Sequence, residues 1–100
     1  NTGGEKVYPE EVEEALKQHS AVEDALVFGV PDERFGNRIV GVISISAGNE
    51  ATADEVIDDT KKRLSSYKVP RSLLIVKQVP RAPNGKADYQ SAHSLFDKTD

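Results

Sequence analysis

The sequence predicts a small α+β domain in which a mainly antiparallel sheet of about three strands is packed by two or three helices. Three observations support this prediction. Apolar residues at helical spacing alternate with short runs rich in Val and Ile, turn residues separate these segments, and 100 residues are enough for one modest core. We therefore expect a single domain over residues 1–100.

The first predicted helix begins at Pro9, because the fixed φ of proline suits the first helical position. Val12, Ala15 and Leu16 then fall on one face at helical spacing, which predicts that this face is buried. The helix is expected to end near residues 19–20. Its four glutamates are interpreted as a solvated face rather than as a catalytic carboxylate pair. They are Glu10, Glu11, Glu13 and Glu14.

Two further helices are predicted from their N-terminal caps. Thr52 and Glu55 have the spacing of a capping box, in which each side chain bonds to the backbone of the other. The helix that they begin should run to about Ser65. Asp88 is placed to cap a short last helix, whose apolar residues include Phe96.

Three apolar runs predict the strands. Residues 25–30 form a continuous run, as expected of a buried strand, and residues 39–46 alternate between two faces with one drier side. We expect these two strands to pair in antiparallel orientation through a loop at 31–38. Residues 73–76 form the third strand, because the prolines on either side favour a strand over a helix.

The composition excludes several classes of protein. Hydrophobic residues make up 37% and charged residues 30% of the chain, as in an ordinary globular domain. The absence of cysteine removes both a disulfide framework and a thiolate metal site, and neither His19 nor His93 has a partner at ligand spacing, so no metal site is predicted. The formal net charge of −4 argues against general affinity for nucleic acid or for an anionic membrane.

No targeting or membrane segment is recognisable in the sequence. No apolar run approaches the roughly 20 residues of a membrane-spanning helix, and residues 1–4 do not resemble a secretory signal. A cytoplasmic location is therefore expected. The lack of an initiating methionine suggests that the chain is cut from something longer.

The basic residues are unevenly distributed. All eight charged residues from Lys61 to Lys86 are basic, whereas the 17 acidic residues lie elsewhere. This tract has two interpretations: a solvated helix end with scattered surface lysines, or a face that meets an anion such as phosphate. At its end, Pro83 and Gly85 predict an exposed turn that projects the Lys86 ammonium, either as a solubilising charge or as a functional one.

Four segments of the chain resemble consecutive signatures of one superfamily, which contains acyl- and aryl-CoA synthetases, luciferases and the adenylation domains of peptide synthetases. They are GGEKVYPEEVE (3–13), GVPDERFG (29–36), YKVPR (67–71) and PRAPNGKAD (80–88). The segments occur in that superfamily's order and cover nearly the whole chain. The first most resembles bacterial fatty acyl-CoA ligases.

The resemblance implies that this chain is the C-terminal lid of a larger ligase. In that superfamily a large N-terminal domain binds ATP, with Mg, and a carboxylic acid, here a medium- or long-chain fatty acid. The small domain closes over it, first for adenylation and then, after rotation, for transfer of the acyl group to coenzyme A. The lid alone is expected to bind none of these co-substrates tightly and to be inactive, because its partner, the N-terminal adenylation domain, is missing.

The same resemblance implies roles for individual residues. Lys86 matches the loop lysine that reaches the acyl carboxylate and the α-phosphate during adenylation. Gly3 and Gly4 match the loop that lines the pantetheine path, where a β-carbon would narrow the tunnel. Lys6 lies where relatives present a polar side chain to the adenylate. No metal ligand is implied.

The residues leave three alternatives open. Lys68 and Arg71 lie where a basic surface would attract the phosphates of coenzyme A. A peptide-synthetase lid would have the same fold and the same Lys86 but would use a carrier protein as the thiol donor. A stand-alone binding or regulatory module would instead use the basic tract to dock an acidic protein or a nucleotide.

Overall fold

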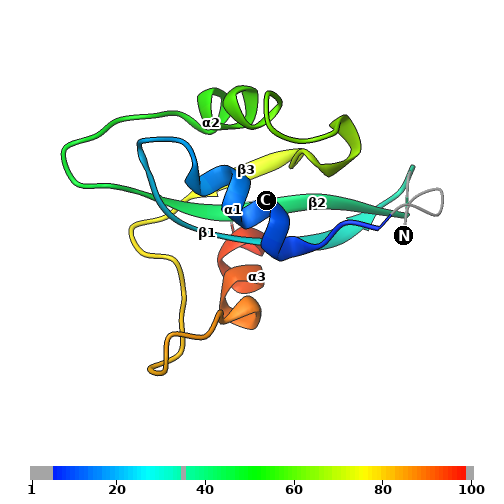
Figure 1. The fold of residues 1–100 in the computed structure, drawn as a ribbon. Coiled ribbons are helices and arrows are strands. Elements are labelled where there is room, and N and C mark those ends of the chain that lie inside the picture. Colours follow the sequence, from blue (N-terminus) through cyan, green and yellow to red (C-terminus); the bar gives the residue numbers. More distant parts are fainter. Residues whose placement is uncertain (1–5, 35, 99–100) are drawn as a thin grey trace.

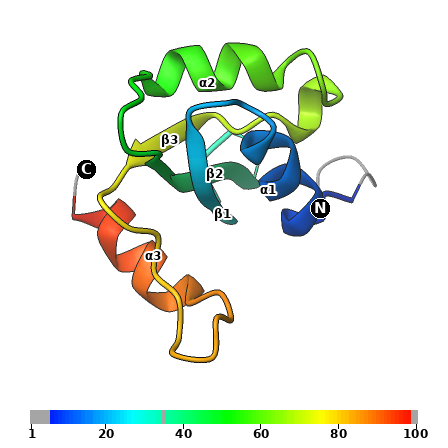
Figure 2. The same ribbon diagram turned by 60° about the vertical axis from the view of Figure 1, so that its left-hand side comes forward.

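A three-stranded sheet lies between two layers of helices in the computed structural model, which describes residues 6–34 and 36–98 (Figure 1). In chain order the elements are α1 (Pro9–Lys17), β1 (Val22–Asp32), β2 (Gly36–Ile45), α2 (Ala53–Thr60), the 3-10 turn η1 (Ser66–Lys68), β3 (Ser72–Ile75) and α3 (Tyr89–Asp97). Helices α1 and α2 cover one face of the sheet and α3 covers the other (Figures 1 and 2). The predicted α+β architecture is confirmed. None of the helices in the described ranges has the length and apolar character needed to cross a membrane.

β1 and β2 form one long antiparallel hairpin, and β3 adds to β2 in parallel orientation. The antiparallel pairing runs from Val22 opposite Ile45 to Asp32 opposite Gly36. The connection from β2 to β3 passes through α2, as a crossover between parallel strands requires. The sheet is therefore mixed, and the mainly antiparallel pairing that the sequence predicts is confirmed.

The hairpin turn is tighter than predicted. The expected loop at 31–38 is wrong, because both strands continue into it. Pro31 is tolerated within β1 because β1 is an edge strand, where a missing N–H can face away from the sheet. Asp32 Oδ1 accepts a 2.8 Å hydrogen bond from the Arg34 N–H, and Gly36 adopts a φ of +80° that favours glycine.

Apolar clusters fill the spaces on both sides of the hairpin. Ala25 and Val27 of β1 pack with α1 and α2, whereas Leu26 and Phe28 pack with α3. This arrangement explains the continuous apolar run, because a strand that is covered on both faces buries every side chain. Gly41 of β2 is required by close packing, since a Cβ there would lie 2.8 Å from the Leu26 carbonyl oxygen.

The predicted helix starts are confirmed at their caps. Thr52 Oγ1 accepts from the Glu55 N–H at 3.1 Å, and Glu55 Oε1 accepts from the Thr52 N–H at 2.9 Å. Asp88 caps α3 by accepting a 3.1 Å hydrogen bond from a backbone N–H in its first turn. Helix α2 ends at Thr60, earlier than predicted, because residues 61–63 are exposed and offer no apolar face to bury.

Candidate active site

The Lys86 loop, which we define as residues 81–86, is a turn beside α3 that projects away from the sheet (Figure 2). The Ala82 N–H donates to the Lys86 carbonyl at 2.9 Å, and the Gly85 N–H donates to the Ala82 carbonyl at 2.8 Å. Gly85 has a φ of +88°, a conformation that side chains with a Cβ rarely adopt. The exposed turn that the sequence predicts is confirmed.

The Lys86 side chain is exposed to solvent. The Lys86 N–H donates to Asn84 Oδ1 at 3.1 Å, which fixes the main chain but does not occupy the ammonium. Across residues 6–34 and 36–98, this ammonium has neither a hydrogen-bond acceptor nor an ion-pair partner. Such a lysine can bind an anion that comes from outside the domain.

Arg81 joins the Lys86 loop to β1. Its Nε and Nη2 donate to the two carboxylate oxygens of Asp24 at 2.7 and 2.8 Å, and its Nη1 donates to the Gly85 carbonyl at 3.0 Å. The hydrogen bond from Arg81 holds the pKa of the Asp24 carboxyl below its usual range, which shows that the ion pair favours the charged form of Asp24. Arg81 and Ala87 also pair as an isolated antiparallel bridge across the base of the loop.

Glu13 is buried, which corrects the interpretation of all four glutamates as a solvated face. The residue is 8% exposed, and its Oε2 accepts hydrogen bonds from the Val27 N–H at 2.9 Å and from the Tyr89 hydroxyl at 2.7 Å. Because β1 is an edge strand, the Val27 N–H has no strand partner on that side and takes the carboxylate instead. Burial and the hydrogen bond to Glu13 both raise the pKa of the Tyr89 phenol. Glu13 of α1 therefore contacts both β1 and the first residue of α3, the helix that follows the Lys86 loop.

A groove of about 590 Å³, here called the tyrosine groove, lies between the segment before α1, the hairpin and η1. Its cationic side chains come from Lys6, Arg38 and Arg71, and its aromatic side chains Tyr8 and Tyr67 are 60% and 39% exposed. Within the described residues, the Arg38 Nε is buried without a hydrogen-bond acceptor. Buried donors of this kind are normally hydrogen-bonded, so this nitrogen is an exception within the described residues.

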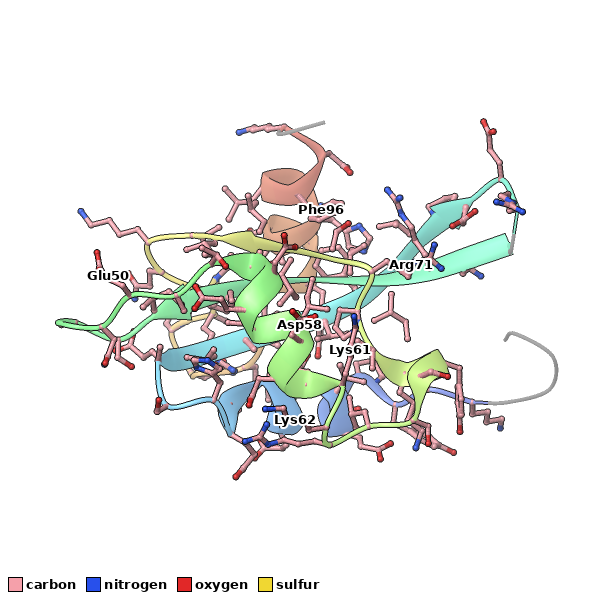
Figure 3. All side chains as sticks on the ribbon, turned by 90° about the horizontal axis from the view of Figure 1, so that it is seen from above. Glu50, Asp58, Lys61, Lys62, Arg71 and Phe96 are labelled. Carbon is pink, nitrogen blue, oxygen red and sulfur yellow. The ribbon has the colours of Figure 1, made fainter. Side chains whose placement is uncertain are left out.

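Neighbouring acids neutralise part of the basic tract. Lys68 forms an ion pair with Glu11 at 2.9 Å, and Lys61 forms one with Asp58 at 3.2 Å. Figure 3 shows Asp58 of α2 beside Lys61, which directly follows the helix, while Arg71 lies between α2 and the projecting end of the hairpin. The basic tract is therefore divided between the segment that follows α2, the tyrosine groove and the Lys86 loop.

The structure separates the residues to which the sequence assigned functions. Lys6 lines the tyrosine groove, whereas Lys86 lies on its own loop and does not line that groove. Gly3 and Gly4 lie outside the described residues. Sequence reasoning missed Arg38 because it fell in the predicted loop, although the alternation of residues 39–46 extends one position back to it.

The fold and the loop define a class of small mixed-sheet domain that presents, at its surface, a lysine without a partner among residues 6–34 and 36–98. The chain belongs to the family described as the AMP-binding enzyme C-terminal domain, which matches residues 11–86. It is 54% identical over 92 residues to the 3-oxocholest-4-en-26-oate–CoA ligase of Rhodococcus rhodochrous, covering 92% of this chain and 17% of that protein. It is 47% identical over 98 residues to a medium/long-chain-fatty-acid–CoA/3-oxocholest-4-en-26-oate–CoA ligase of Mycolicibacterium smegmatis. That match covers 98% of this chain and 18% of that protein.

Solved structures share the fold. The Mycobacterium tuberculosis fatty acyl CoA synthetase matches with a TM-score of 0.85 and 28% identity, over 98% of this chain and 19% of that one. The Brucella canis acyl-CoA synthetase matches with a TM-score of 0.84 and 31% identity, over 99% of this chain and 19% of that one. The chain thus spans less than a fifth of the length of these relatives. The resemblance to the superfamily and the predicted fold are confirmed.

Proposed function

We propose that this chain is the C-terminal lid of an AMP-forming acyl-CoA ligase and that Lys86 acts in its adenylation step. The substrate would be a hydrophobic carboxylic acid such as a medium- or long-chain fatty acid, which the names of the two relatives support. The main observation is that an exposed ammonium without a partner among the described residues stands on a loop that is fixed at its base. The large domain would supply the sites for ATP with Mg and for the acid.

The proposed chemistry has two steps. In the first, the substrate carboxylate attacks the α-phosphorus of ATP and pyrophosphate leaves, while the Lys86 ammonium stabilises the negative charge on the carboxylate and phosphoryl oxygens. In the second, the thiol of coenzyme A attacks the acyl carbon and AMP leaves. The lid would present the Lys86 loop for the first step and, after rotation, Gly3, Gly4 and Lys6 for the second, in which Gly3 and Gly4 would line the pantetheine path.

We assign the tyrosine groove to the nucleotide end of coenzyme A. Its two arginines, Arg38 and Arg71, would contact phosphates, and its two tyrosine rings provide faces on which an adenine can stack. Of Lys68 and Arg71, which the sequence offered for the phosphates of coenzyme A, this assignment keeps only Arg71, because Lys68 does not line the groove and is paired with Glu11.

The full-length ligase should catalyse acid-dependent ATP–pyrophosphate exchange, and the isolated 100-residue chain should show none, because the site for ATP lies on the other domain. A ligase truncated before this chain should lose most of the exchange activity. Exchange by the isolated chain, or full activity of the truncated ligase, would contradict the proposal. Amide shifts confined to residues 61–86 when an acidic peptide is added to the isolated chain would favour the stand-alone module instead.

Arg38→Ala in the full-length ligase should raise the KM for coenzyme A about tenfold, because a charged hydrogen bond to a phosphate is lost. ATP–pyrophosphate exchange should be unchanged, since it does not involve coenzyme A. Arg63→Ala is the matched control, because its guanidinium is paired with Asp59 on α2 and it does not line the groove. An unchanged KM for coenzyme A would remove the groove from the proposal, as would a preference for a carrier protein as the thiol donor.

A further inference from the structure

We propose that Arg81 and Asp24 are positioning residues for adenylation: their ion pair fixes the Lys86 loop on β1 so that the ammonium reaches its anion in one orientation. This inference rests on the proposed role of Lys86. It assigns a function to two residues that lie outside both the loop tip and the tyrosine groove.

The geometry of Arg81 uses all three guanidinium nitrogens. Nε and Nη2 form a bidentate pair with Asp24 at 2.7 and 2.8 Å, and Nη1 holds the carbonyl of Gly85, the residue directly before Lys86, at 3.0 Å. One planar group therefore links the main chain next to Lys86 to the sheet. Lysine has no equivalent fork of donors, so only arginine can make these contacts together.

Asp24 is itself held in place. The pairing of β1 with β2 shifts register between Val22 and Asp24, and such a bulge redirects a side chain relative to a regular strand. Its Oδ1 also accepts a 2.9 Å hydrogen bond from the Ala25 N–H. The carboxylate therefore offers Arg81 a fixed partner at the edge of the sheet.

The other hydrogen bonds of the loop do not replace this link. Those of Ala82, Asn84 and Gly85 lie within the loop, so they fix its shape but not its direction. In the part of the chain that the structure describes, Arg81 makes the only hydrogen bonds and ion pairs between residues 81–86 and β1. Electrostatic stabilisation depends on placing the charge to within about 1 Å, so loss of this link should affect the reaction more than the fold.

The test separates the two half-reactions in the full-length ligase. Arg81→Lys and Asp24→Asn should each lower the kcat of acid-dependent ATP–pyrophosphate exchange about ten- to a hundredfold, with little change in the KM for ATP. Transfer of the acyl group from preformed acyl-adenylate to coenzyme A should keep its rate. In a Lys86→Ala background, the same two substitutions should cause no further loss, because there is no longer a charge to position. Arg63→Lys, which alters the ion pair between Arg63 and Asp59 at the end of α2, should change neither step.

The outcomes distinguish the inference from the function on which it rests. If Arg81→Lys slows both half-reactions equally, or if its effect adds to that of Lys86→Ala, the ion pair is merely structural and the inference is wrong. If Lys86→Ala impairs exchange while Arg81→Lys and Asp24→Asn do not, the inference fails and the proposed function stands. If Lys86→Ala has no effect, the proposed function fails first.

Discussion

Lys86→Ala in the full-length ligase is expected to lower the rate of acid-dependent ATP–pyrophosphate exchange by at least about a hundredfold. An ammonium about 4 Å from a phosphoryl oxygen contributes about 4 kcal/mol at an effective dielectric of 20, and this contribution grows as negative charge develops in the transition state. The Lys86 ammonium has no partner to leave within the described residues, so this energy is not offset by a broken ion pair. The loss should appear in kcat rather than in the KM for ATP.

Two control variants test separately whether the position of the charge and the kind of cation matter. Lys77→Ala removes an exposed cation from the same basic tract, outside the Lys86 loop, and should leave exchange unchanged. Lys86→Arg retains the charge on a bulkier, planar group and should restore only part of the rate. Transfer from preformed acyl-adenylate to coenzyme A should be nearly normal in the Lys86→Ala ligase. A ligase that tolerates Lys86→Ala without loss of exchange would refute the assigned role.

Glu13→Ala should lower the free energy of unfolding of the 100-residue chain by about 2 to 4 kcal/mol, the largest effect on stability that we expect outside the apolar core. The substitution leaves the buried Val27 N–H without an acceptor, removes the partner of the Tyr89 hydroxyl and opens space beneath α1. Urea unfolding followed by circular dichroism measures the change.

Two variants show whether the buried Glu13 carboxylate is responsible for the loss of stability. Glu14→Ala removes the adjacent, exposed glutamate and should change stability by less than about 0.5 kcal/mol. Tyr89→Phe removes one of the two hydrogen bonds to Glu13 and should cost about 1 kcal/mol. Equal stabilities of the Glu13→Ala and Glu14→Ala chains would show that the hydrogen bonds of Glu13 contribute nothing to the free energy of unfolding.

The local features of the fold are predictable from the sequence because their causes are local. The Thr52–Glu55 capping box and Asp88 mark helix starts through hydrogen bonds that span three residues, Pro9 does so through its fixed φ, and the structure has all three starts. The apolar run at 25–30 identified a strand that is covered on both faces. The extent of the hairpin was not predictable in the same way, since Pro31 is a turn signal in most contexts and is accepted here only because β1 is an edge strand.

The candidate site was only partly predictable. The Lys86 loop follows from Pro83, Gly85 and the lysine itself, whose conformational preferences need no distant partner. Glu13 was misread because its burial depends on an N–H of β1 that lies 14 residues away in the sequence. Its place three residues before Leu16, at the border of the apolar face, was the available signal.

The contacts that join the last third of the chain to β1 and α1 have a consequence for the order of folding. Arg81 pairs with a residue 57 positions earlier, and Tyr89 bonds to one 76 positions earlier. Closing such long loops costs more conformational entropy than closing the β1–β2 hairpin, whose strands are adjacent in the sequence. During refolding we therefore expect the hairpin and α1 to assemble before the Lys86 loop acquires its final orientation, which should appear only after most of the secondary structure has formed.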